Sequence, residues 1–379
     1  MLFDYENLRI IWWLLLGVLL TAFAIMDGFD LGVGILLPFV ARTDAERRVV
    51  INTVGPVWEG NQVWLILGAG SIFAAWPLIY AVAFSGFYLA ILLVLFALIL
   101  RPVGFKYRSK MPGIFWRTTW DRLLFVGGFV PALVFGVAMG NALEGAPFRF
   151  DDMMRMSYQG GLFGLLNPYA LVCGLVSVAM LTLHGAAYLA LKTMGLVAER
   201  ARLIGALAGV TLIFLFAGAG IWTGLGIEGY RIVGTLPHDA ASNPLAKSVV
   251  RETGAWLSNY GSQPVTLLAP VLGFAGAALG AMMLAAERPA LGFAASTAAV
   301  IGVVATAGVS MFPFVLPSSL DPASSLTVWD ASSSRTTLLI MLVAVSVFVP
   351  IIIAYTAFGY HVAWGKVTNE TVDADHMSY

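Results

Sequence analysis

The sequence predicts an all-α integral membrane protein, and its composition and the spacing of its apolar stretches carry that prediction. Hydrophobic residues make up 59% of the 379 residues and charged residues only 11%, whereas soluble domains carry about 25% charged residues. Nine stretches are mostly apolar and reach the roughly 20 residues that a helix needs to cross a bilayer. We therefore expect a single membrane domain over residues 1–379, with nine transmembrane helices.

The expected helices divide into two four-helix bundles and one further helix. The first bundle lies within residues 1–143 and comprises 8–39, 51–75, 77–100 and 123–143. The second lies within residues 162–316 and comprises 162–193, 203–225, 265–286 and 290–316, and the ninth helix covers 336–364. A short internal repeat supports this division, because Gly17 precedes Asp27-Gly28 at the same spacing at which Gly174 precedes His184-Gly185.

The distribution of Lys and Arg predicts the orientation in the membrane, since short cytoplasmic loops are enriched in them. Fourteen of the 21 basic residues fall in the odd-numbered loops and the C-terminal tail, among them Arg42, Arg101, Lys106, Arg202 and Lys366. The N-terminus is therefore expected outside the cytoplasm and the C-terminus inside.

Two outer loops carry recognisable local signals. In the loop over about 226–264, Ser242-Asn243-Pro244 resembles a helix start, and 245–257 mixes apolar and charged residues as a surface helix would. In the loop 317–335, Ser332 to Ser334 is expected to cap the ninth helix. Neither loop carries a catalytic motif.

Several functional classes and cofactor sites are excluded. The net charge is zero, which speaks against a nucleic-acid partner, and the lone Cys173 allows neither an internal disulfide nor a cysteine metal site. Of the four histidines only His184 lies deep in an expected span, so a haem site with two histidine ligands cannot form on this chain, and ligation by His184 with a methionine is the alternative. His184 is instead expected to hydrogen-bond to a neighbouring backbone group or carboxylate.

A buried charge cluster is expected where three helices approach the cytoplasm. Asp27 and Asp30 are three residues apart on one face of the first helix, near the end whose dipole disfavours carboxylates. Arg101 ends the third helix on the same side and is expected to pair with one of them, Asp30 being the preferred partner. A purely structural ion pair that joins the helices is the alternative to a functional site.

The start of the second helix carries the polar run Trp58-Glu59-Gly60-Asn61-Gln62. No cation lies close to Glu59 in sequence, so this carboxyl is a candidate proton-transfer group, and Asn61 and Gln62 could continue a polar path inward. The alternative is that Glu59 only forms structural hydrogen bonds. Trp58 fits a role in packing or in the membrane interface.

At these same positions the sequence resembles subunit II of the cytochrome bd family of quinol:oxygen oxidoreductases. The resemblance runs from end to end and is carried by Asp27-Gly28-Phe29-Asp30, Trp58-Glu59-Gly60-Asn61-Gln62, Arg101-Pro102-Val103-Gly104 and Met311-Phe312-Pro313-Phe314. This sequence departs from the family at Glu59, where relatives carry aspartate. The carboxyl group is the same, but the glutamate side chain is longer.

The resemblance implies a bacterial cytoplasmic-membrane complex that oxidises quinol and reduces dioxygen to water. It implies a partner subunit I that binds haem b and haem d, small single-helix accessory subunits, and lipid and quinone as further ligands. This chain would ligate no haem through its own side chains, and Glu59 would lie at the face that meets subunit I. A proton-coupled secondary transporter and a purely structural scaffold are the rival interpretations.

Overall fold

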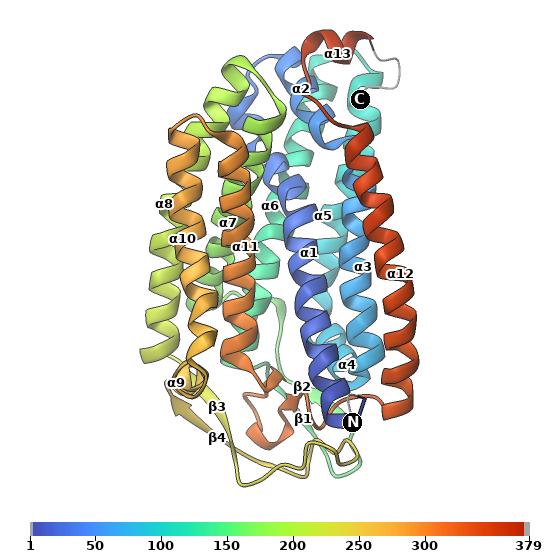
Figure 1. The fold of residues 1–379 in the computed structure, drawn as a ribbon, viewed down its shortest axis with the longest axis vertical. Helices are drawn as coiled ribbons and strands as arrows, with labels where there is room; N and C mark the ends of the chain where they lie inside the picture. The colour runs from blue at the N-terminus through green and yellow to red at the C-terminus, as the bar shows by residue number, and fades with distance from the viewer. Residues whose placement is uncertain (1–2, 375–379) are drawn as a thin grey trace.

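The computed structural model describes residues 3–374 and is dominated by long helices (Figure 1). Within that part of the chain, eight helical segments are long and apolar enough to cross a membrane. They are α1 (Tyr5–Val40), α5 with the turn after it (Tyr88–Lys110), α6 (Ile114–Glu144), α7 (Pro168–Lys192), α8 (Gly195–Leu225), Pro264–Ala285 with α10 (Leu268–Ala285), α11 (Pro289–Met311) and α12 (Arg335–Val362). The all-helical membrane class is confirmed, and nine crossings stay a prediction.

The expected second helix, 51–75, is two helices in the structure. α2 (Asp44–Val54) ends before Gly55-Pro56, and α3 (Trp58–Ala75) begins after it. Pro56 has no N–H to donate to the helix, and although Gly55 keeps helical geometry, Val57 departs from it, so the helix is interrupted there. α2 begins with a capping box between Thr43 and Glu46, in a segment that was expected to be a loop.

The expected third helix, 77–100, is also divided. α4 (Pro77–Gly86) ends at Gly86, Phe87 leaves helical geometry, and α5 proper (Tyr88–Tyr107) continues. A Cβ atom at position 86 would lie only 2.5 Å from the ring of Tyr158. The glycine therefore lets this aromatic side chain pack directly against the break.

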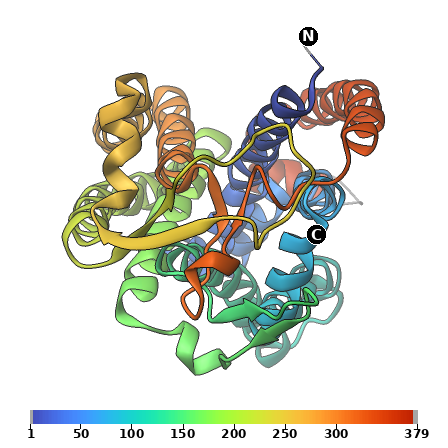
Figure 2. The same ribbon diagram turned by 90° about the horizontal axis from the view of Figure 1, so that it is seen from below.

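The long helices lie side by side and run along the long axis of the molecule (Figure 1). Seen from below, α7, α8, α10 and α11 gather on one side, and α1 and α12 lie on the other (Figure 2). α1 is central, since it packs against α3, α6, α7 and α11, while α12 packs mainly against α1 and α3. α12 consequently leaves most of its apolar surface exposed.

Glycines make the central contact between α1 and α7 unusually close. A Cβ atom at Gly32 would lie 2.0 Å from the carbonyl oxygen of Leu181, and one at Gly185 would lie 2.5 Å from the carbonyl carbon of Gly32. Any larger residue would push the two backbones apart. This contact holds the face of α1 with Asp27 and Asp30 in the interior.

Three short antiparallel hairpins cover one end of the helices, here called the strand end. They pair β1 (Phe148–Phe150) with β2 (Met156–Tyr158), β3 (Glu228–Val233) with β4 (Ser248–Thr253), and β5 (Phe314–Leu316) with β6 (Leu326–Thr327). The N-terminus lies at this end, and the C-terminal segment with α13 (Asn369–Ala374) lies at the opposite, α13 end (Figure 1).

The prediction of a surface helix over 245–257 is wrong, because β4 lies within this segment. Asn243 accepts the N–H of Leu245, two residues on, as in a turn rather than a helix cap. Val249 and Val250 then pair with Ile232 and Arg231 in the β3–β4 hairpin, where β-branched side chains fit well. The expected cap of the last helix is confirmed, because the Ser334 side chain accepts the N–H of Thr337.

Candidate functional site

The centre of the site is a buried ion pair between α1 and α5. Arg101 donates from both terminal nitrogens to the two Asp27 oxygens, at 2.8 and 3.0 Å. The Arg101 side chain is 2% exposed and that of Asp27 is fully buried. Gly127 on α6 makes room for the pair, since a Cβ atom there would lie 3.0 Å from the Arg101 side chain. Arg101 therefore pairs with one of the two expected aspartates, and only the preference for Asp30 over Asp27 is wrong.

Asp30 has a different set of partners. Its Oδ2 accepts a hydrogen bond of 2.9 Å from the side-chain amide of Asn61, and the Asn61 oxygen accepts one of 2.7 Å from the hydroxyl of Tyr360. Asp30 and Asn61 are both buried. These hydrogen bonds connect α1, α3 and α12, so a polar contact that was not predicted from the sequence joins the last spanning helix to the charge cluster.

The side chains of Glu59 and Asn61 diverge because two residues advance a helix by about 200°. Asn61 faces the interior, whereas the Glu59 side chain is 67% exposed and its nearest cation is Lys106 of α5, at 3.6 Å. Gln62 is half-buried, and Trp58 is buried against Phe105. Glu59 and Asn61 therefore lie on different faces of α3, and a proton path from Glu59 stays a prediction.

A second ionic cluster at the α13 end was missed in the sequence. Arg108 is 1% exposed and donates to both Asp121 of α6 and Asp44 at the start of α2. Arg47 adds a 2.9 Å bond to Asp121, and Arg117 pairs with Asp44. These residues lie in predicted cytoplasmic loops, where charges are ordinary, so no signal marked Arg108 and Asp121 as buried.

A buried ion pair also holds the strand end together. The Lys247 amine lies 2.7 Å from an oxygen of Asp330, and both side chains are at most 3% exposed. Burial lowers the pKa of Lys247, and the Asp330 carboxylate opposes that shift. Arg9 of α1, fully buried, donates nearby to Ser332 and to the carbonyls of His238 and Ala240. This end of the molecule is thus fixed by polar contacts between distant segments.

His184 is bonded at both ring nitrogens, as expected of a structural histidine. Nδ1 lies 2.9 Å from the hydroxyl of Ser296, and Nε2 lies 3.0 Å from the carbonyl of Ile25. To bind a metal through either nitrogen, the ring would have to give up one of these bonds. No cluster of three or more His, Cys, Asp or Glu side chains suited to a metal ion occurs within the described residues.

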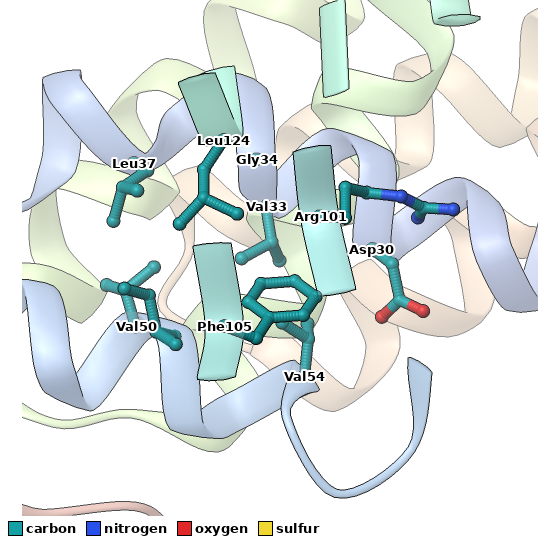
Figure 3. A pocket seen from close by; sticks show the side chains of 10 residues that line it. Asp30, Val33, Gly34, Leu37, Val50, Val54, Arg101, Phe105 and Leu124 are labelled. Carbon is teal, nitrogen blue, oxygen red and sulfur yellow. The ribbon is translucent and has the colours of Figure 1, made fainter. Parts of the chain in front are cut away.

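A small cavity adjoins the charge cluster. Ten residues line it, and its volume is about 10 Å³. Asp30 and Arg101 lie together at one end of the lining, while Leu37 and Val50 lie at the other end (Figure 3). The cavity is thus polar at one end and apolar at the other.

Comparison with known proteins identifies the family. The family model described as cytochrome bd terminal oxidase subunit II matches residues 8–363. The chain is 49% identical over 375 residues to the cytochrome bd-I ubiquinol oxidase subunit 2 of Escherichia coli strain K12, a match that covers 99% of each chain. It is 30% identical to the cytochrome bd ubiquinol oxidase subunit 2 of Bacillus subtilis, over 96% of this chain and 98% of the relative.

A solved structure has the same fold. The bd oxidase from Geobacillus thermodenitrificans contains a chain that superimposes with a TM-score of 0.64 at 16% identity, covering 93% of this chain and 97% of that chain. The family match spans nearly all of the described helices and includes Asp27, Glu59 and Arg101. The protein therefore belongs to the cytochrome bd terminal oxidase subunit II family.

Proposed function

We propose that this chain is the haem-free subunit of a quinol oxidase and supports a haem-bearing subunit I, which oxidises quinol and reduces dioxygen to water. The observation that carries the proposal is the end-to-end family match. The bonds that occupy both nitrogens of His184 support it, since the one deep histidine is already used for packing. No complete active site is assigned to this chain, and haem b and haem d are assigned to the partner.

The proposed setting is the bacterial cytoplasmic membrane. We infer nine crossings, arranged as two four-helix bundles and a last helix, in which α3 is the second crossing and adds to the eight spans described above, with the strand end outside and the α13 end inside. The basic residues at the α13 end support this orientation. Single-helix accessory subunits, lipid and quinone are the further proposed partners.

The experiment that tests this function is capture of the complex through a tag on this chain. The captured material is expected to show reduced-minus-oxidised haem bands and to consume oxygen when quinol is supplied. Membranes from cells that lack this chain are the control. Captured protein without haem and without oxygen uptake, but with solute transport after reconstitution, would show the transporter interpretation to be correct instead.

Glu59 is proposed to lie where this chain meets subunit I and to deliver cytoplasmic protons toward the oxygen-reducing haem. Its side chain lies on the exposed face of α3, together with the half-buried Gln62 and the exposed Ile66. Charged groups within membrane helices rarely face lipid, so a protein partner is the expected cover for this face. Because Asn61 points away, the path from Glu59 continues through the partner rather than through this chain.

Oxygen consumption by variants of the assembled complex tests the proton role. Glu59→Gln keeps the size of the side chain but cannot release a proton, so turnover should fall while haem content stays unchanged. Glu59→Asp should retain activity. Glu287→Gln is the matched control, because Glu287 is 71% exposed and paired with Arg202 in the same way. Full turnover of Glu59→Gln at acid and alkaline pH would leave only a structural role.

A further inference from the structure

Two buried polar atoms of the charge cluster lack a partner among the described residues. One is Oδ1 of Asp30, and the other is Nε of Arg101. Both residues are 1% exposed. The other polar atoms of the same side chains are bonded, to Asn61 and to Asp27. An unpaired polar atom in a protein interior destabilises the folded state, so a partner for these two atoms is expected.

The same two side chains line one cavity. Asp30 and Arg101 form its polar end, and the remaining lining residues that Figure 3 labels are apolar side chains and Gly34. The volume of about 10 Å³ is near the lower limit for holding one water molecule, about 10 to 15 Å³. The cavity therefore has room for one small ligand and for nothing of the size of a lipid or a quinone.

We propose that a single buried water molecule occupies this cavity and bridges Asp30 and Arg101. Its oxygen accepts the Nε–H of Arg101, and one of its hydrogens is donated to Oδ1 of Asp30. A water molecule serves both atoms because it accepts and donates, and two polar partners are the minimum for an ordered buried water. A metal cation fits poorly, since the N–H of a guanidinium offers it no lone pair.

The bridging water joins two hydrogen-bonded groups into one network. Without it, the Asp27–Arg101 pair of α1 and α5 and the Asp30–Asn61–Tyr360 chain of α1, α3 and α12 are separate. With it, four helices share a continuous path of hydrogen bonds. This inference is independent of the role proposed for Glu59, which faces away from the cavity.

A density map of the purified oxidase complex, at a resolution where other buried waters are visible, tests the proposal. The wild-type map should show one solvent peak within hydrogen-bonding distance of Oδ1 of Asp30 and Nε of Arg101. Val54→Ile adds a methyl group near Asp30 and should remove the peak, whereas Val50→Ile adds the same group at the apolar end and should keep it (Figure 3).

Thermal unfolding of the same variants gives a second measurement. A displaced water leaves both polar atoms unpaired, so Val54→Ile should lower the unfolding midpoint more than Val50→Ile does. A wild-type map without the peak would overturn the proposal. So would a rise of the midpoint in Val54→Ile, because filling an empty apolar cavity stabilises a protein.

Discussion

Replacement of Arg101 by alanine is predicted to destabilise the protein strongly. The change removes both hydrogen bonds to Asp27, of 2.8 and 3.0 Å, and leaves a carboxylate with no exposure in the interior. Removal of one partner of a buried ion pair typically destabilises by about 3 to 5 kcal/mol. Gly127 and the cavity lie beside the vacated space, so a void adds to the effect.

Arg155→Ala is the matched control. Arg155 pairs with Asp151 at 3.0 Å, but the two side chains are 73% and 48% exposed, and an exposed pair contributes about 0 to 1 kcal/mol. The yield of assembled complex and its thermal midpoint should therefore fall in Arg101→Ala and stay near wild type in Arg155→Ala. Equal yields and midpoints for the two variants would refute the structural role of the buried pair.

Three further predictions concern other contacts. Asn61→Leu removes the amide that donates to Asp30 and should destabilise the protein by about 1 to 3 kcal/mol. Its thermal midpoint should lie below that of the control Gln62→Leu, because Gln62 is only half-buried. Lys247→Met leaves the buried Asp330 unpaired, so limited proteolysis should cut the strand end faster than in wild type. For Glu46, burial alone would raise the pKa, but the N–H groups of Arg42 and Thr43 and the Arg200 guanidinium together lower it. The ionised Glu46 side chain therefore stabilises the fold above its ordinary pKa, and this stabilisation should be lost as pH falls through the lowered pKa. In Glu46→Gln the thermal midpoint should depend less on pH in that acid range.

The helices were predictable because their main determinant is local. An apolar run of sufficient length forms a helix in a membrane whatever surrounds it, which is why α10 and α12 agree with the expected spans. The divisions at Pro56 and Gly86 were not predicted, although the Gly55-Pro56 pair was a signal in the sequence. The β3–β4 hairpin was missed because its stability depends on pairing between Ile232 and Val249, 17 positions apart.

The sequence indicated which residues lie close together in the charge cluster, but not which of them form the ion pair. Position along a helix indicated that Asp27, Asp30 and Arg101 share one level. It could not indicate which carboxylate Arg101 reaches, because that depends on how α1 and α5 are rotated against each other. The separation of Glu59 from Asn61 could have been found, since residues two apart lie on opposite sides of any helix.

We propose that this chain supports the oxidase without binding a haem itself, and the haem content of the assembled His184→Ala complex is the decisive measurement. His184 is the deeply buried histidine of the described spans, and its ring bonds Ser296 and Ile25. We expect a reduced-minus-oxidised spectrum with the same haem bands per complex as wild type, and oxygen consumption when quinol is supplied. Loss of one haem equivalent from a fully assembled complex would contradict it.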